Sequence, residues 1–330
     1  MRYRPLGRTG VLVSELSFGA MTFGQMGSIA KVDAAGAGRL VGLCLDAGVN
    51  LFDTADAYAA GSSEELLGRA LGPRRREVLI ATKVGFPSGP GVNERGLSYH
   101  HVVASAEASL RRLGTDWIDL LQIHKHDAST PFEETARALD DLVRRGLVRS
   151  LGLSNLPAWE AALALGLQRQ RGYAPFAAAQ MYYSLVGRDL EHEFVPFLKH
   201  AGLGLLVWSP LAAGYLTGKY TGQRPGAEGD RRRHYAFPPV DAALGPRVVE
   251  ALGKLAASRG ATPAQVALAW LLARPFVSSV LVGASTPGQL LENLAAGALS
   301  LAPEEQAELD ALTAPPRIYP PAYYDFFSDD

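Results

Sequence analysis

Short apolar runs alternate along this chain with segments of helical apolar spacing, and this alternation limits the possible folds more than any other feature. Eight runs have the length and composition of strands: residues 15–19, 49–53, 78–83, 117–124, 148–154, 177–182, 204–209 and 277–283. Amphipathic segments lie at residues 33–47, 63–71, 98–113, 131–145, 157–170, 190–200 and, as one longer stretch, 247–273. Because strands that alternate with helices pair in parallel, the pattern predicts an α/β protein.

Eight strand–helix units of about 35 residues fit a closed (β/α)8 TIM barrel. We therefore predict one domain over residues 1–330, although about 150 residues per domain would suggest two. Residues 1–14 have the pattern of an N-terminal hairpin around Gly10. The polar, Gly- and Pro-rich stretch 222–239 predicts a long loop after strand seven. Residues 314–330 form a C-terminal aromatic tail, which we expect to dock on the barrel.

The alternative is an open, doubly wound sheet, in which a nucleotide-binding protein usually carries G-x-G-x-x-G after its first strand. Gly36 and Gly38 have the first spacing of that motif, but Gly42 does not complete it and the segment is helical in pattern. Residues 214–219 fail as a phosphate-binding P-loop because their spacing is short and Tyr220 stands where Ser or Thr is required. The barrel is the better interpretation.

The composition is that of a globular protein, with 48% hydrophobic residues, 20% charged residues and a net charge of -1. It excludes a disordered chain and a general nucleic-acid binder, which would carry a basic excess. Apolar stretches such as 201–208 fall far short of the roughly 20 residues of a membrane span. The N-terminus lacks a signal-peptide core, and the single cysteine, Cys44, cannot form an internal disulfide. We expect a cytoplasmic protein with no nucleic-acid or membrane partner.

Three consecutive predicted strands end on reactive side chains. Strand two ends at Asp53, with Tyr58 five residues beyond it, strand three ends at Lys83, and strand four ends at His124. Any one of them could be a solvated residue at the end of a strand. In a (β/α)8 barrel, however, all four would face the same mouth, where such barrels carry out their chemistry. We predict that they form a catalytic site.

These four side chains complement one another for donating a proton to an oxygen. A phenol, with a pKa near 10, gives up its proton reluctantly at neutral pH unless a cation stabilises the phenolate. Lys83 supplies that cation, Asp53 holds the ammonium charged and oriented, and His124 can hydrogen-bond a carbonyl oxygen. Such a site suits the addition of a hydride to a carbonyl, provided that a hydride donor lies alongside.

The later strands carry side chains suited to holding that donor. Ser154, Asn155 and Gln180 can bond a carboxamide, and the indole of Trp208 can stack on a flat ring. The region after strands seven and eight is where barrels commonly bind phosphate. The cofactor-binding candidates are Thr22, Asp53, Ser154, Asn155, Gln180, Trp208, Ser209, Pro210, Leu211, Gly214, Gly218, Lys219, Arg231, Gly283, Ser285, Gln289, Glu292 and Asn293.

The chain resembles the aldo-keto reductase family over nearly its whole length. LFDTADAY (51–58), IATK (80–83) and LQIH (121–124) are similar to the family's catalytic motifs. GLSN (152–155), QMYYS (180–184), WSPL (208–211), GK (218–219) and residues 283–293 are similar to its nicotinamide-cofactor motifs. The resemblance implies an NADPH-dependent reductase of a small aldehyde, ketone or keto sugar, with NADH left open as the cofactor. It implies Tyr58 as general acid, Lys83 and Asp53 as its tuning pair, and His124 as the group that orients the carbonyl.

Two positions depart from the common pattern of that family. Many members carry an arginine after the Gly-Ala of strand eight to bind the 2′-phosphate of NADPH, where this chain has Ser285 and Thr286. Many relatives have tyrosine or phenylalanine in place of Trp208. Both choices resemble the branch that contains voltage-gated potassium channel β subunits and their bacterial relatives. The alternative function is therefore a cofactor-sensing binding module with slow, incidental turnover, and a homo-oligomer is left open.

The segment 124–127, His-Lys-His-Asp, contains a His-x-His spacing that could ligate a metal in a barrel hydrolase. We predict no metal there because Lys83 would compete as a cation and no further histidine ends a predicted strand.

The scarcity of lysine generates a first prediction, since only six of the 32 basic residues are lysines. A compact ammonium with a tunable pKa cannot be replaced by a guanidinium. Lys83→Arg should therefore lower carbonyl-reducing activity nearly as much as Lys83→Met, whereas Lys31→Arg and Lys254→Arg should leave steady-state rates unchanged. Equal rates for Lys83→Arg and the wild type would show that the scarcity reflects composition alone.

Overall fold

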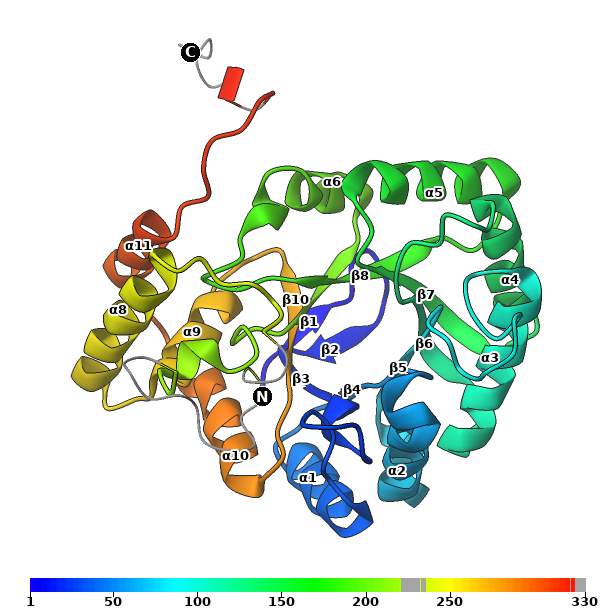
Figure 1. Ribbon diagram of the computed structural model, residues 1–330, viewed down its shortest axis with the longest axis horizontal. Coiled ribbons are helices and arrows are strands. Elements are labelled where there is room, and N and C mark those ends of the chain that lie inside the picture. The colour runs from blue at the N-terminus through cyan, green and yellow to red at the C-terminus, as the bar shows by residue number, and fades with distance from the viewer. Residues whose placement is uncertain (221–231, 233–235, 321, 324–330) are drawn as a thin grey trace.

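The structure is a computed structural model that describes residues 1–220, 232, 236–320 and 322–323. Its centre is a closed barrel of eight parallel strands in the order β10-β3-β4-β5-β6-β7-β8-β9, surrounded by helices (Figure 1). Each strand pairs with its neighbour along the chain, and β10 closes the barrel against β3. The prediction of an α/β TIM barrel is confirmed.

The eight barrel strands overlap the eight predicted runs and differ from them only at their ends. They are β3 (Leu16–Gly19), β4 (Leu51–Asp53), β5 (Leu79–Val84), β6 (Ile118–Ile123), β7 (Val148–Ser154), β8 (Phe176–Tyr182), β9 (Gly204–Trp208) and β10 (Val277–Val282). The helices are α1 (Ala34–Asp46), α2 (Ser62–Leu71), α3 (Tyr99–Leu113), α4 (Phe132–Arg144), α5 (Ala158–Arg171), α6 (Phe194–Ala201), α8 (Leu244–Arg259), α9 (Pro263–Leu272), α10 (Pro287–Ala295) and α11 (Pro303–Leu312).

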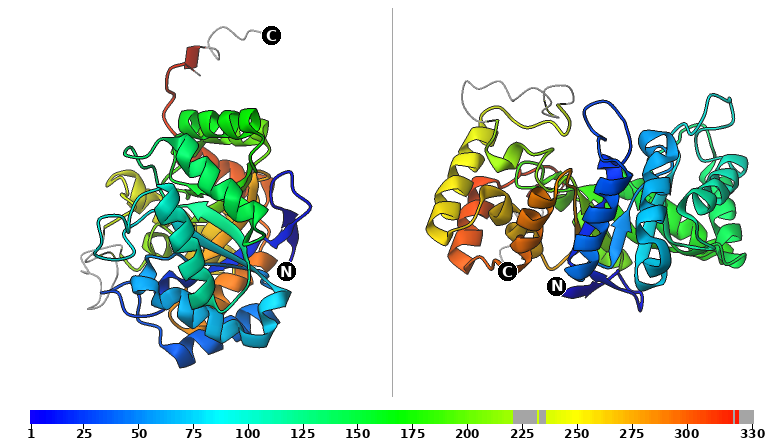
Figure 2. Two further views of the ribbon diagram at one scale, coloured as in Figure 1. Left: turned by 90° about the vertical axis from the view of Figure 1, so that its right-hand side faces the viewer. Right: turned by 90° about the horizontal axis from the view of Figure 1, so that it is seen from below.

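The N-terminal segment forms the predicted hairpin, whose strands β1 (Tyr3–Pro5) and β2 (Leu12–Ser14) pair antiparallel. It lies at the end of the barrel opposite the loops that follow β3 and β5 (Figure 2). Gly7 has a φ of 60°, and a Cβ there would lie 2.6 Å from the backbone of Gly202 and Gly204. The hairpin turn is therefore pressed against the chain that enters β9, and the C-terminal ends of the strands lie at the other end.

Residues 247–273, predicted as one helical stretch, form two helices. Gly260 ends α8 with a φ of 60°, a conformation that glycine adopts without strain. Thr262 then caps α9 through a reciprocal capping box with Gln265, and Pro263 fits the first turn. These cap signals outweigh the continuous apolar periodicity, so the single stretch was a wrong prediction. Helix α11 was not predicted.

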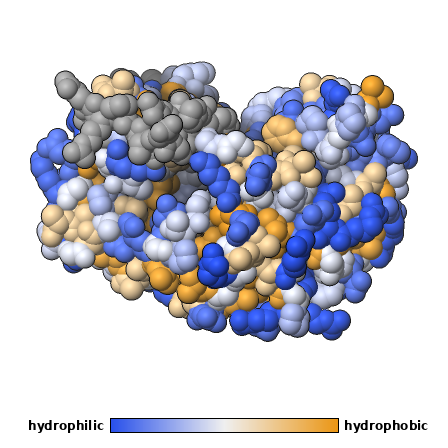
Figure 3. Space-filling model, turned by 60° about the horizontal axis from the view of Figure 1, so that its bottom comes forward, coloured by the Kyte–Doolittle hydropathy of each residue, from blue (hydrophilic) through white to orange (hydrophobic). Residues whose placement is uncertain are grey.

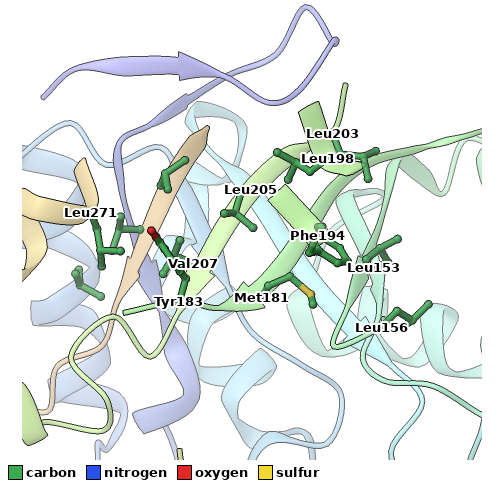
Figure 4. Packing of buried hydrophobic residues seen from close by; sticks show 14 of the residues in the cluster. Leu153, Leu156, Met181, Tyr183, Phe194, Leu198, Leu203, Leu205, Val207 and Leu271 are labelled. Atoms are coloured by element: carbon green, nitrogen blue, oxygen red, sulfur yellow. The ribbon is translucent and has the colours of Figure 1, made fainter. Parts of the chain in front are cut away.

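The largest buried cluster lies around β7, β8, β9 and β10 and the helices outside them (Figure 4). Tyr183 and Trp270 are fully buried in it, with their ring centroids 5.5 Å apart. The indole N–H of Trp270 donates to Asp310 at 2.9 Å, and the guanidiniums of Arg188 and Arg274 lie over the indole ring. These contacts tie α11 to the barrel.

The described part of the C-terminal tail leads away from α11 and from the barrel (Figures 1 and 2). Ile318, Tyr319 and Tyr323 are exposed, so the expectation that the tail docks on the barrel is wrong for these residues. The rest of the tail, residues 321 and 324–330, lies outside the described residues, as does most of the predicted loop 222–239.

Across the described residues, no helix has the length and apolar character that a membrane crossing requires. The face shown in Figure 3 mixes hydrophilic and hydrophobic residues, with an apolar patch near its centre.

The contact between α2 and α3 generates a second prediction. A Cβ on Gly68 would collide with the backbone carbonyl of Leu113, whereas a Cβ on Gly38 in α1 would meet no atom within 4 Å. Gly68→Ala should therefore lower the free energy of unfolding by roughly 1–3 kcal/mol, because the two helices must separate. Gly38→Ala, the matched control, should raise it by about 0.5–1 kcal/mol through helix propensity.

Chemical denaturation of both alanine variants and the wild type measures these changes. A stabilising Gly68→Ala would contradict the close approach of the two helices.

Candidate active site

Four side chains predicted from three consecutive strands meet at the C-terminal end of the barrel. Asp53 ends β4, Lys83 lies near the end of β5, His124 directly follows β6, and Tyr58 begins the 3-10 helix η2 (Tyr58–Gly61). Lys83 Nζ lies 2.5 Å from Asp53 Oδ1 and 3.4 Å from Tyr58 Oη. The rings of Tyr58 and His124 meet edge to face, with their centroids 5.7 Å apart. The structure brings all four predicted residues together.

Lys83 is buried, with only 1% of its surface exposed. Burial is the largest single effect and lowers the pKa of the ammonium, but the charges and hydrogen bonds of Asp53 and Tyr58 together outweigh it, so the pKa of Lys83 is raised. The backbone carbonyl of Thr54 also accepts a hydrogen bond from Nζ at 2.8 Å. Lys83 is therefore a cation at neutral pH.

Two glutamines fix the second oxygen of Asp53. The amide groups of Gln122 and Gln180 donate to Asp53 Oδ2 at 3.1 Å and 2.7 Å. Gly152 leaves the room for this arrangement, since a Cβ there would lie 2.9 Å from Gln122 Cγ. Gln122 was not among the predicted site residues, although it lies two residues before His124 and so shares a face of β6 with it. Gln180 was predicted to bond a carboxamide, and its amide nitrogen here donates to Asp53.

His124 is an uncharged imidazole at the mouth of the barrel. Burial lowers its pKa well below the usual value, and the charges of Lys83 and Lys125 lower it further. Its Nδ1 atom is buried without a hydrogen-bond partner among the described residues. The ring of Phe86 meets it edge to face, 4.6 Å between centroids. A neutral imidazole in this position can donate a hydrogen bond to an oxygen of a bound molecule.

Asn155 and Trp208 form the side of the site beyond His124. The indole N–H of Trp208 donates to Asn155 Oδ1 at 3.1 Å, and Asn155 Nδ2 donates to the backbone carbonyl of His124 at 3.0 Å. The Trp208 ring also contacts the rings of Tyr182 and Phe237. A chain of hydrogen bonds thus joins the cofactor candidates of β7 and β9 to the catalytic candidate of β6.

The other cofactor candidates lie at the ends of β7, β9 and β10. Ser154 Oγ donates to the carbonyl of Gln180 at 2.7 Å, and Thr22 Oγ1 donates to the carbonyl of Ala284 at 2.8 Å. Thr286 caps α10, a helix N-terminus suited to an anion. Ser209, Pro210, Leu211, Gly214, Gly218, Lys219, Gly283, Ser285, Gln289, Glu292 and Asn293 belong to these segments, and Arg231 lies outside the described residues.

Backbone strain marks the same end of the barrel. Every non-glycine residue of the described chain with a positive φ follows the C-terminal end of a barrel strand: Ala59 and Ala60 after β4, Asn155 after β7, and Ser209, Ala212 and Ala213 after β9. Such a conformation costs of order 1–3 kcal/mol and persists where the surrounding structure holds a functional geometry. The strain and the polar side chains therefore point to one site.

The second histidine of the His-x-His segment, His126, pairs with Glu160. His126 Nδ1 lies 2.9 Å from Glu160, and half of the side chain of His126 is exposed. Across residues 1–220, 232, 236–320 and 322–323, no group of three or more His, Cys, Asp or Glu could hold a metal ion.

Comparison with known proteins places this geometry in a family. Residues 15–314 match the family model described as the Aldo/keto reductase family. The chain belongs to this family. Two relatives, from Arabidopsis thaliana and Oryza sativa subsp. japonica, are each 40% identical over 306 residues, covering 90% of this chain and 91% of each relative, and both are named probable voltage-gated potassium channel subunit beta. A putative subunit of the same kind from Schizosaccharomyces pombe is 37% identical over 306 residues, 89% of this chain and 87% of its own.

The buried ion pair generates a third prediction. Asp53→Asn leaves the Lys83 ammonium without a counter-charge, so the free energy of unfolding at neutral pH should fall by about 3–5 kcal/mol. In the wild type the raised pKa of Lys83 contributes stability below pH 10.5 that is lost as the pH rises through the folded-state value. In the variant, where burial is no longer offset by the charge of Asp53, the pKa of Lys83 should fall below 10.5, and stability should instead increase as the pH rises toward 10.5.

Denaturation at several pH values measures both slopes. The control is Asp46→Asn, at a carboxylate that is 77% exposed, which should change stability by less than about 0.5 kcal/mol. If the free energy of unfolding changed with pH in the same way in Asp53→Asn and the wild type, Asp53 would not be the residue that raises the pKa of Lys83.

Proposed function

We propose that this protein is a reductase that uses NADPH to convert a small aldehyde, ketone or keto sugar into an alcohol. The observation that carries the proposal is the contact of one buried ammonium with both a carboxylate and a phenol, Lys83 with Asp53 and Tyr58. A cation beside a phenol favours the phenolate and so favours release of the phenolic proton. Membership of the aldo/keto reductase family supports the same reaction class.

Tyr58 is the proposed proton donor. As negative charge develops on the substrate oxygen, the phenol gives its proton to that oxygen, and the ammonium of Lys83 stabilises the phenolate that remains. Asp53, held by Gln122 and Gln180, keeps the ammonium in place. The neutral imidazole of His124 donates a hydrogen bond that orients the carbonyl.

The residues around the mouth fit a nicotinamide dinucleotide. When bound, that cofactor supplies the hydride. Trp208 offers an aromatic surface for the nicotinamide, and Asn155 offers an amide that already bonds the indole. The N-terminus of α10 is suited to a phosphate group. Lys219 lies in the long connection between β9 and α8 and can supply a cation for the 2′-phosphate. NADPH is therefore preferred over NADH in this proposal.

A second candidate is a binding module that senses the redox state of its cofactor, with slow turnover. The names of the plant and yeast relatives, potassium channel subunits, favour it. It differs from the first candidate in its kinetics, because cofactor exchange would be slow and a partner protein would form a stable complex. Rapid turnover of a small carbonyl compound would decide in favour of the reductase.

Substitution of the proposed proton donor tests the function and is the fourth prediction. Purified protein with NADPH and a panel of aldehydes should consume the nicotinamide absorbance. Tyr58→Phe should lower kcat by about 10²–10⁴-fold, because only the proton donor is lost, while the Kd for NADPH, measured by fluorescence, stays unchanged. The control is Tyr3→Phe, in the hairpin at the other end of the barrel, where the Tyr3 hydroxyl donates to the backbone carbonyl of Gly48. This variant should keep the wild-type rate.

Two results would count against this assignment. Full activity of Tyr58→Phe would exclude Tyr58 as the proton donor. Loss of NADPH binding in that variant would instead assign Tyr58 a part in binding the cofactor.

A further inference from the structure

A second carboxyl group, that of Asp56, comes between Asp53 and Tyr58 in the sequence, and the proposed reaction does not use it. Asp56 is 2% exposed. Its Oδ2 atom accepts a hydrogen bond from Ser105 Oγ on α3 at 2.5 Å, and its backbone N–H donates to the carbonyl of Lys83 at 3.1 Å. Its Oδ1 atom is buried without a hydrogen-bond partner among the described residues. Asp56 therefore connects the segment before Tyr58 to both α3 and β5.

The other end of the same turn is held by the same helix. Arg112 of α3 pairs with the buried carboxylate of Glu64 in α2 at 2.7 Å, and Thr82 of β5 bonds the other oxygen of Glu64. A Cβ on Gly61 would lie 2.8 Å from Arg112 Cδ, so the guanidinium arm rests against the last residue of the turn. Ser105 and Arg112 are two helical turns apart on one face of α3.

The turn between these two anchors is strained. Ala59 and Ala60, the residues directly after Tyr58, have φ values of 48° and 52°. Left-handed backbone at two consecutive alanines is not an intrinsic preference, so contacts from outside the turn must hold it. The anchors on α3 supply those contacts, one before Tyr58 and one after it.

We propose that Asp56 is a positioning residue whose buried carboxyl group, bonded to Ser105, holds the turn that presents Tyr58 to the site, and whose ionisation loosens that turn because it leaves a buried charge beside Glu64. The reason lies in the local charges. Glu64 is neutralised by Arg112, and Lys83 by Asp53. Ionised Asp56 would be a buried negative charge in no ion pair of the described residues, near the second carboxylate of Glu64.

The titration of Asp56 falls near neutral pH. The pKa of Asp56 is raised to about 7. Burial is the main cause and the charge of Glu64 adds to it, whereas the Ser105 hydroxyl, the charge of Arg112 and the backbone N–H of Ala57 oppose the rise. On α3, the imidazole of His101 bonds the backbone at Phe86 rather than Asp56. A raised folded-state pKa contributes stability that is present below the unfolded value and lost as the pH rises through the folded value. The turn should thus loosen as the pH rises from about 4 through about 7.

The experiment that tests this proposal, our fifth prediction, observes Tyr58 directly. In protein with 13Cζ-labelled tyrosine, the Tyr58 resonance, assigned through Tyr58→Phe, should shift between pH 5 and pH 9 with an inflection near 7 in the wild type. Asp56→Asn keeps the shape of the side chain but cannot ionise, so its Tyr58 resonance should show no inflection there. The control is Asp116→Asn, at an exposed carboxyl before β6, which should keep the wild-type curve.

A second variant covers the case in which Asp56→Asn fails to fold. Ser105→Ala removes the hydroxyl that lowers the pKa of Asp56, so the inflection of the Tyr58 resonance should move to higher pH. An unmoved inflection in Ser105→Ala, or a wild-type inflection retained in Asp56→Asn, would overturn the proposal.

The role of Asp56 rests on the proposed function only through the assignment of Tyr58 as proton donor. If the protein reduces carbonyl compounds, kcat should decline above pH 7 in the wild type and stay level in Asp56→Asn over the same range. If no carbonyl compound is turned over, the resonance and a thermal melt against pH still report the ionisation. An Asp56-dependent inflection without turnover would contradict only the proposed reductase function. Turnover without an Asp56-dependent inflection would contradict only the positioning role of Asp56.

Discussion

The buried contact between Lys83 and Asp53 is the interaction on which the rest of the site depends. An ammonium that is 1% exposed is stable only with a close counter-charge, and the 2.5 Å contact with Asp53 supplies it. The two residues lie on neighbouring strands, so the parallel register of β4 and β5 sets the distance. Gln122, Gln180 and the Thr54 carbonyl then satisfy the remaining polar atoms. Tyr58 and His124 complete the site around a cation that the barrel holds in place.

Strain and order are distributed around this pair in a way that suits a binding site. The hairpin seals the N-terminal end of the barrel, and the described non-glycine residues with left-handed backbone all follow the C-terminal ends of barrel strands. The turn that carries Tyr58 is one of two described segments in which two consecutive alanines take up left-handed backbone, the other being Ala212 and Ala213 after β9. Its anchors on α3 link the phenol to a second group of buried charges, Asp56, Glu64 and Arg112. Both groups include a residue of β5, since Lys83 pairs with Asp53 and the neighbouring Thr82 bonds Glu64.

Periodicity predicted the eight strands well because strands that are buried on both faces are short, nearly continuous apolar runs. Strand ends predicted the four site residues because a closed parallel barrel gathers the carboxyl ends of its strands. The division of 247–273 into α8 and α9 was missed, since the cap formed by Thr262 and Gln265 interrupts a pattern that stays apolar throughout. The docking of the tail was also wrong for its described part, because aromatic composition shows that a segment can be buried and does not show where a partner surface lies.

By itself, the sequence determined the barrel, the four reactive side chains and the family, because apolar periodicity and the identity of the residue at each strand end are local properties of the chain. Only the tertiary structure decided how those side chains act on one another. Gln122 holds Asp53 because β6 and β4 approach across the barrel interior, and Asp56 becomes a buried, partly unpaired carboxyl because α3 covers it. Burial, hydrogen bonding and the distance between charges arise from packing between elements far apart in the chain, and no local pattern encodes them.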